Sequence, residues 1–243
     1  MFKPKIKAII TDVDGTLTIN REDYRLEMEA IKAIRKAEEQ RTPVILISGN
    51  ALPIVVSISR YIGTTGPVVG ENGCLIFYKG KILSVATFSA RDTVKAVLEK
   101  FGNYIEPSWQ NVYRVFDFAF KVKKNFRNKV DLIVSDIQKF LEIKGFNNVF
   151  VTFSGYALHL TPTSGGKDKG LLKALELIGL RKDEVICIGD GLNDIDLFRI
   201  CQYSATVSNA DEELKKLATY VASKPSGKGF AEIVEYILNS SGI

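Results

Sequence analysis

Short, continuously apolar stretches alternate along this chain with longer stretches in which apolar residues recur at helical spacing. Strands of the first kind are expected at residues 5–13, 42–50 and 184–190, and helices of the second kind at 22–40 and 167–180. Strands that are apolar on both faces and separated by helices are typical of a parallel sheet covered by helices on both sides. The pattern therefore predicts an α/β fold with a doubly wound parallel-sheet core. The same periodicities predict further helices at 52–63, 194–202, 210–218 and 229–240, strands at 203–208 and 220–223, and a short strand with a hairpin within 67–84.

The middle of the chain follows a different pattern. Helices are expected at 90–101 and 126–144, but the strands expected at 112–122, 147–153 and 156–161 include two neighbours with no helix between them. Adjacent strands of this kind predict a small α+β domain inserted into the core. The expected division is a first core segment at 1–83, an inserted α+β domain at 84–160 and a second core segment at 161–243.

Positive charge is concentrated in the insert. Residues 84–160 hold 11 Lys and Arg residues against 7 Asp and Glu residues, a net +4 of the chain's +5. Such a field can attract an anionic ligand, although a solvated basic face explains the count equally well. No DNA- or RNA-binding motif accompanies the charge, so nucleic acid is not expected as a partner.

Membrane attachment and secretion are not expected either. No apolar run approaches the roughly 20 residues that a membrane span requires, and the N-terminal residues run into a charged strand rather than a signal peptide. Cys74, Cys187 and Cys201 show no CxxC spacing, so we expect small buried residues rather than a disulfide framework or a zinc site. The resulting expectation is a cytoplasmic protein.

Polar residues follow three predicted strands at the point where each strand ends. The first strand ends at the pair Asp12 and Asp14, the second ends in Ser48 and Asn50, and the third runs into the segment GDGLND (189–194). Ligands of open parallel sheets bind at the carboxyl ends of the strands. We therefore expect one pocket composed of Asp12, Asp14, Ser48, Lys169, Asp190 and Asp194.

The chemistry of this pocket favours a hard cation. Clustered carboxylates without a cation would repel one another and raise their own pKa values. Oxygen ligands without His or Cys are those that Mg²⁺ prefers. The only histidine, His159, lies in an expected strand, so carboxylates and lysines are the expected catalytic groups.

Each motif alone is weak. A DxD pair is common at turns, and GDGLND could be a glycine-rich loop with an N-capping side chain. The segment SGGKDKG is not a phosphate-binding P-loop, because Thr161 stands where that motif needs a glycine. The argument rests on the order of the motifs and on their placement at strand and helix ends.

Taken in this order, the motifs resemble those of the haloacid dehalogenase superfamily of phosphohydrolases. The matching segments are DVDGT (12–16), ISG (47–49), DKG (168–170) and GDGLND (189–194). The segment GENG (70–73) and the long insert after it are similar to the subgroup with an α/β cap, and within that subgroup to the archaeal phosphoglycolate phosphatases. Many relatives have Thr-Gly-Arg at the second motif, whereas Ser48, Gly49 and Asn50 keep the hydroxyl and lose a cationic contact.

The resemblance implies a mechanism through an aspartyl-phosphate. Asp12 would be the nucleophile, and Asp14 would be the general acid and base. Magnesium would be held by Asp12, the backbone carbonyl of Asp14 and Asp190, with Asp194 ligating directly or through water. The residues implied in substrate binding are Ser48, Gly49 and Lys169, with Asn193 contributing at most indirectly.

Three functions are compatible with these features. The first is a magnesium-dependent phosphomonoesterase acting on a small anionic phosphorylated metabolite, for which the resemblance implies 2-phosphoglycolate. The second is a sugar phosphatase or phosphomutase of the same superfamily. The third is a phospho-acceptor or binding module without turnover, which would have no evident use for Asp14 or for the insert. The aromatic-rich strand of the insert could support a homodimer.

Overall fold

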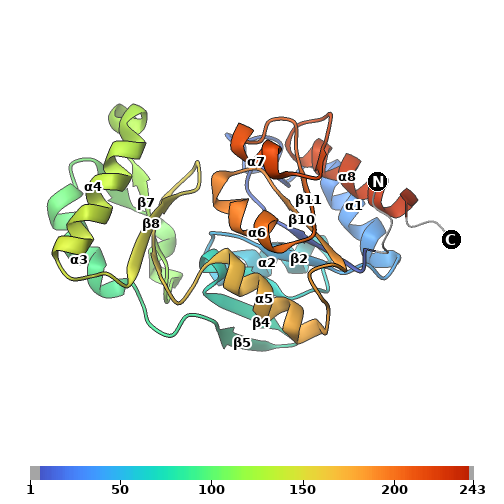
Figure 1. The fold of residues 1–243 in the computed structure, drawn as a ribbon, viewed down its shortest axis with the longest axis horizontal. Coiled ribbons are helices and arrows are strands. Elements are labelled where there is room, and N and C mark those ends of the chain that lie inside the picture. Colours follow the sequence, from blue (N-terminus) through green and yellow to red (C-terminus); the bar gives the residue numbers. More distant parts are fainter. Residues whose placement is uncertain (1–5, 241–243) are drawn as a thin grey trace.

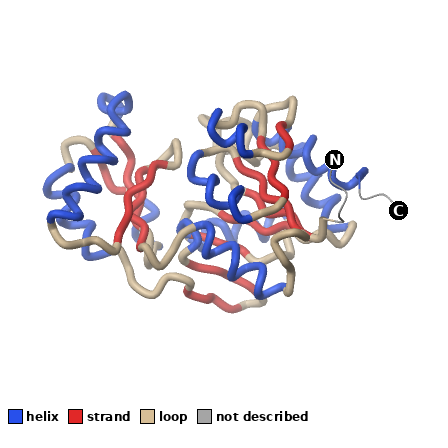
Figure 2. Tube along the Cα trace, viewed as in Figure 1, coloured by secondary structure: helices blue, strands red, loops and turns tan. Residues whose placement is uncertain are grey.

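The structure is a computed structural model that describes residues 6–240, and it contains two sheets (Figure 1, Figure 2). The larger sheet has the strand order β12-β11-β10-β1-β2-β3-β4-β5. Its strands from β12 to β3 pair in parallel, and β4 and β5 add an antiparallel edge. This order confirms the predicted doubly wound core; Lys5, at the start of the first expected strand, lies outside the described residues. The strands are β1 (Ala8–Thr11), β2 (Val44–Ile47), β3 (Val68–Gly70), β4 (Leu75–Tyr78), β5 (Lys81–Ser84), β10 (Val185–Gly189), β11 (Tyr203–Thr206) and β12 (Tyr220–Val221).

Helices cover both faces of this sheet because its central strands are apolar on both faces. Ile9 of β1 packs with α1, α2 and α8, and the next residue, Ile10, packs with α5, α6 and α7 on the opposite face. Both side chains are fully buried, and burial of each contributes about 1.5–3 kcal/mol. The helices are α1 (Met28–Glu39), α2 (Leu52–Ile62), α5 (Lys167–Ile178), α6 (Ile195–Ile200), α7 (Glu212–Leu217) and α8 (Ser226–Ser240).

The smaller sheet forms a separate layer beside the core, at the left of Figure 1. Its strands pair antiparallel in the order β6-β7-β9-β8. One face packs Phe118, Phe120 and Leu158 against two helices. The chain enters this layer after β5 and leaves it through β9, shortly before α5 begins. Its elements are α3 (Arg91–Phe101), β6 (Ile105–Pro107), β7 (Phe118–Val122), α4 (Val130–Ile143), β8 (Val149–Phe153) and β9 (Leu158–Pro162).

The first expected helix begins six residues late, at Met28 instead of residue 22. The side chain of Asn20 accepts hydrogen bonds from the backbone N–H groups of Glu22 and Asp23, and Asp23 accepts one from the N–H of Arg25. These local bonds satisfy backbone donors without a helix, which is how Asn and Asp compete with helix formation.

The strand expected at 112–122 is shorter and begins only at Phe118. Residues Trp109–Tyr113 form a 3₁₀ turn instead. After it, the buried carboxylate of Glu71 accepts the backbone N–H groups of Val115, Phe116 and Asp117, which a strand would have used in its ladder. This contact ties the smaller layer to the core, and the sequence pattern gives no sign of it.

The cysteines differ from the expectation of three unpaired residues. Cys187 and Cys201 form a disulfide between β10 and the end of α6, while Cys74 is free and buried. The spacing of the cysteines in the sequence does not indicate that β10 and α6 pack together. Among residues 6–240, no helix combines the length and apolar character that crossing a membrane requires.

Candidate active site

Three carboxylates meet at the carboxyl end of the larger sheet. Asp12 follows β1, Asp190 follows β10, and Asp194 lies in the turn that opens α6. All three are buried, and each offers an oxygen that lies within 4.8 Å of the others. The structure therefore brings together three of the expected metal ligands, and this set of oxygen donors fits a hard divalent cation.

Two cations of the protein also contact this cluster. The ammonium group of Lys167 lies 2.7 Å from both Asp12 Oδ1 and Asp194 Oδ1. Arg21 donates from Nε to Asp190 Oδ2 at 2.7 Å and from NH1 to Asp211 at 2.9 Å. Buried charges of one sign are costly without partners, so Lys167 and Arg21 compensate part of the negative charge.

The expected position of Lys169 in the pocket is wrong. Lys169 is exposed, and its ammonium group donates to the backbone carbonyls of Thr163 and Gly165. Two residues on a helix that are two positions apart point about 200° away from each other. Only one of the two lysines at the start of α5 can therefore reach the cluster, and the structure places Lys167 there.

We expect Lys167→Met to lower kcat/KM for phosphate release by about 10²- to 10³-fold, as for the loss of a preorganised donor in other active sites. Lys169→Met is the matched control and should stay within about threefold of the wild type, because its side chain lies on the surface. Steady-state assays with thermal midpoints test the pair. A large loss in Lys169→Met with little change in Lys167→Met would contradict this assignment.

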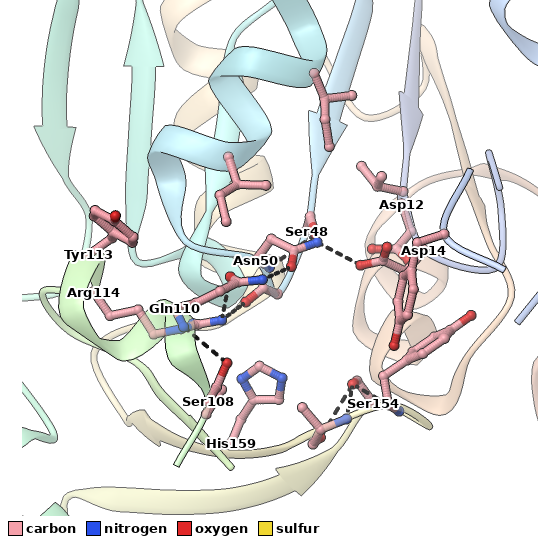
Figure 3. Close-up of a pocket in the computed structure, with 18 of the residues that line it drawn as sticks. Asp12, Asp14, Ser48, Asn50, Ser108, Gln110, Tyr113, Arg114, Ser154 and His159 are labelled. Carbon is pink, nitrogen blue, oxygen red and sulfur yellow. Dashed lines mark hydrogen bonds between the residues drawn. The ribbon is translucent and has the colours of Figure 1, made fainter. Parts of the chain in front are cut away.

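Asp14 lies at the mouth of the site and is held by the loop after β2. Asn50 donates from Nδ2 to Asp14 Oδ2 at 2.6 Å and to Ser48 Oγ at 3.1 Å (Figure 3). Gln110, from the smaller layer, donates to Asn50 Oδ1 at 2.7 Å. Asn50 thus orients the Asp14 carboxylate, and the smaller layer in turn holds Asn50.

Gly15 is required by close packing at the cluster. Its φ of +83° favours glycine, and a Cβ there would lie 2.3 Å from Asp190 Oδ2 and 2.7 Å from Tyr156 Oη. Tyr156 comes from the loop between β8 and β9, and its buried hydroxyl has no hydrogen-bond partner among the described residues. The hydroxyl is available to a ligand beside Asp190.

A cavity of about 810 Å³ lies between the two layers. Its lining includes Asp12, Asp14 and Asp190 from the core and Gln110, Tyr156 and His159 from the smaller layer. The expected residues Ser48, Gly49 and Asn193 also line it. Sequence reasoning missed Lys167, Arg21, Gln110 and Tyr156; only Lys167 carried a signal, since it is the first lysine of the motif KDKG.

Burial raises the pKa values of the site carboxyls. It raises the pKa of Asp12 well above its usual value, with Lys167 opposing and Asp194 adding to the rise. Burial, with a contribution from Asp194, raises the pKa of Asp190 from 3.8 to about 6. Burial also raises the pKa of Asp14, against the hydrogen bond from Asn50. Asp14 is therefore suited to hold a proton closer to neutral pH than an exposed carboxyl is.

These pKa shifts predict pH-dependent stabilisation by magnesium. The folded protein holds the Asp190 proton more tightly than the unfolded chain, so the metal-free protein loses stability as the pH rises from 3.8 to about 6. Bound Mg²⁺ would compensate the ionised carboxylates. We expect Mg²⁺ to raise the thermal midpoint more at about pH 7.5 than at about pH 5. Equal shifts at both pH values, measured by calorimetry, would contradict this.

Comparison with known proteins agrees with the motifs. The sequence model of the haloacid dehalogenase-like hydrolases matches residues 9–145 and 110–234. A phosphoglycolate phosphatase of Staphylothermus marinus is 43% identical over 235 residues, covering 96% of this chain and 98% of the relative. Another from Metallosphaera sedula is 38% identical, covering 96% and 100%. A crystal structure of a Thermoplasma acidophilum protein superposes with a TM-score of 0.81 at 29% identity, covering 96% of this chain and 98% of that chain.

Proposed function

Because the chain belongs to the family of haloacid dehalogenase-like hydrolases, we propose that it is a magnesium-dependent phosphomonoesterase that converts 2-phosphoglycolate to glycolate and phosphate. The observation that carries the chemistry is the pairing of Asp12 and Asp14 at one strand end, with Lys167 bonded to Asp12. The substrate is inferred from the relatives named phosphoglycolate phosphatase, which match over nearly the whole chain.

The first half of the reaction belongs to Asp12 and Asp14. A carboxylate oxygen of Asp12 attacks phosphorus, and the bond from phosphorus to the glycolate oxygen breaks. Asp14 gives its proton to that oxygen, so glycolate leaves with a hydroxyl group. The raised pKa of Asp14 suits this role, since the proton must be present before the bond breaks.

The second half releases the phosphate. Asp14, now ionised, takes a proton from water as the water oxygen attacks phosphorus, and the bond from phosphorus to Asp12 breaks. This returns Asp12 to its carboxylate and Asp14 to its acid. Lys167 and the hydroxyl of Ser48 would hold phosphoryl oxygens, where charge is present in the transition state.

The residues that would hold Mg²⁺ are Asp12, Asp190 and Asp194, together with the backbone carbonyl of Asp14. The ion supplies positive charge that lets an anionic nucleophile approach an anionic phosphate. Arg21 bonds to the side chain and the backbone carbonyl of Asp190, so it is placed to keep that ligand oriented.

The insert at 84–160 acts, in this proposal, as a cap over the cavity. Gln110 from the insert bonds to Asn50, which holds Asp14, and Tyr156 from the insert lines the cavity. Such a cap would exclude water and select the leaving group. The phosphatase would act in the cytoplasm. A homodimer contact through the aromatic-rich strand expected at 112–122 would use Tyr113, because Phe118 and Phe120 are buried in the cap.

The cavity volume also supports a second candidate, a sugar phosphatase, because about 810 Å³ exceeds what 2-phosphoglycolate fills. A panel of phosphorylated metabolites, assayed for phosphate release with Mg²⁺, distinguishes the two. The proposal expects the highest kcat/KM with 2-phosphoglycolate. A higher value with a hexose phosphate would favour the second candidate, and transfer of phosphate to another sugar hydroxyl would indicate a phosphomutase.

A further inference from the structure

His159 occupies a position that the mechanism above does not use. It lies on β9, opposite Ala119 of β7 and Thr152 of β8. Leu158 and Leu160, its neighbours along the strand, pack into the cap's apolar core, so His159 points to the opposite face, which lines the cavity. Figure 3 shows the imidazole directed from the cap strand into the cavity.

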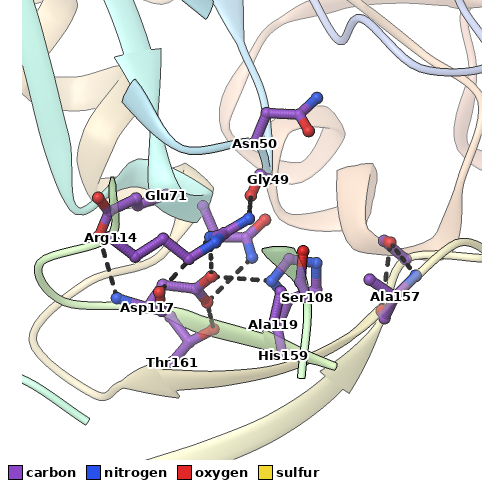
Figure 4. Close-up of polar contacts among 12 residues, drawn as sticks. Gly49, Asn50, Glu71, Ser108, Arg114, Asp117, Ala119, Ala157, His159 and Thr161 are labelled. Atoms are coloured by element: carbon purple, nitrogen blue, oxygen red, sulfur yellow. Dashed lines mark hydrogen bonds and ion pairs between the residues drawn. The ribbon is translucent and has the colours of Figure 1, made fainter. Parts of the chain in front are cut away.

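A buried carboxylate fixes the orientation of this ring. His159 Nδ1 lies 2.8 Å from Asp117 Oδ1, and the Asp117 side chain is fully buried (Figure 4). Burial opposes ionisation of Asp117, but His159 and the other donors hold the pKa of this carboxyl below its usual value. An ionised carboxylate only accepts hydrogen bonds, so Nδ1 donates the proton and Nε2 is the nitrogen left for a ligand.

The remaining contacts of Asp117 make this support rigid. Its carboxylate also accepts hydrogen bonds from Arg114 NH1 at 2.6 Å, Thr161 Oγ1 at 2.6 Å and Asn72 Nδ2 at 3.1 Å. Arg114 donates onward from NH2 to the carbonyl of Gly49 at 2.7 Å. The network joins the cap to the loop that carries Ser48. The imidazole is therefore held in a fixed position relative to the catalytic groups.

The edge of the imidazole that carries Cε1 and Nε2 lies over Gly49, in the loop that follows β2. A Cβ added to Gly49 would lie 3.3 Å from His159 Cε1 and 3.4 Å from Nε2. Asp14 and His159 line the same cavity from opposite layers. Within the described part of the chain, Nδ1 is the only ring atom with a hydrogen bond. The imidazole therefore offers Nε2 to the cavity beside Gly49.

Other cationic side chains of the cap are less suited to this place. The terminal nitrogens of Arg114 are used by Asp117, Gly49 and Gln110. Lys121 lines the same cavity but is exposed at its rim, where its charge is solvated. His159 is 3% exposed, so a bond from it to an anion would be shielded from water.

We propose that His159 determines the specificity for the leaving group, by donating a hydrogen bond from Nε2 to a carboxylate carried next to the ester carbon of the substrate. The inference rests on the proposed function and names its substrate class, phosphate esters of 2-hydroxy acids. Because Nδ1 donates to Asp117, a hydrogen bond donated from Nε2 requires a proton on both ring nitrogens, and the ring then lies between two carboxylates. An ester without the carboxylate would leave this donor without a partner.

The first test compares 2-phosphoglycolate with 2-hydroxyethyl phosphate, which replaces the carboxylate by an alcohol. His159→Gln should lower the ratio of their kcat/KM values by about 10- to 100-fold, the worth of one hydrogen bond to a charged group. Most of the change should lie in KM for 2-phosphoglycolate. Lys121→Gln, the matched control in the same cavity, should leave the ratio unchanged.

The outcomes separate this inference from the proposed function. The wild-type rate with 2-phosphoglycolate tests the function, and the change in the ratio tests His159. An unchanged ratio in His159→Gln would overturn the inference and leave the phosphatase intact. A drop in the kcat/KM ratio that occurs only in Lys121→Gln would overturn the inference too, because it would show that Lys121 binds the substrate carboxylate.

A second test needs no variant, since His159 is the only histidine in the chain. Its ¹⁵N resonances can be assigned in protein labelled at histidine. The unreactive analogue 3-phosphonopropionate, which carries the carboxylate, should shift the Nε2 resonance strongly, whereas propylphosphonate should not. Equal shifts with both analogues would contradict a contact with the carboxylate.

Discussion

Asp12→Asn is expected to lower phosphate release by at least about 10⁴-fold while the protein stays folded. The substitution removes the attacking carboxylate and a metal ligand, but it preserves the volume of the side chain. Its amide oxygen can still accept a hydrogen bond from Lys167, which keeps its second contact with Asp194. Less carboxylate repulsion remains in the cluster, so the thermal midpoint of the metal-free protein should be equal or higher.

The matched control is Asp196→Asn, which removes a carboxylate two residues beyond Asp194 on the exposed side of α6. Its activity should equal that of the wild type. Phosphate release and thermal midpoint are measured on all three proteins, with and without Mg²⁺. Activity of Asp12→Asn above a few per cent of the wild type would contradict the nucleophile assignment.

Removal of divalent metal should likewise abolish activity. Three carboxylates in the site each offer an oxygen that lies within 4.8 Å of the others. Lys167 and Arg21 offset only part of the charge of these carboxylates. Without a further cation, the phosphate dianion would meet a negative site. We therefore expect a fall of at least about 10³-fold with a chelator and full recovery with Mg²⁺.

Calcium gives a sharper version of this experiment. Ca²⁺ accepts more ligands at longer distances than Mg²⁺, so it should bind and raise the thermal midpoint but support little turnover. Titration of each ion into chelator-treated protein, followed by activity and calorimetry, tests this. Full activity in the chelated protein would contradict the magnesium site.

The sequence predicted the core and the acidic cluster because both depend on local patterns. Apolar strands ending in Asp12, Ser48 and Asp190 follow from periodicity, and their convergence follows from the topology of parallel sheets. Local patterns could not predict whether Lys167 or Lys169 contacts the acidic cluster. It depends on the rotational phase of α5 at its first turn, which the preceding loop sets.

Contacts between distant segments explain the other differences. Arg21 reaches Asp190 from the loop just before residue 22, where the first helix was expected to begin, and Glu71 binds backbone donors at 115–117. The network around Asp117 joins residues 45 and 42 positions apart, and no local pattern records such pairs.

The most direct test of the account is to trap the phosphoryl group on Asp12. In Asp14→Asn, p-nitrophenyl phosphate should still react because its leaving group needs no proton, while hydrolysis of the aspartyl-phosphate should be slow. The account predicts a burst of about one nitrophenolate per protein. After acid quench and borohydride reduction, mass spectrometry should locate the modification at residue 12. A burst with the modification at another residue, or turnover without any trapped phosphoryl group, would contradict the mechanism.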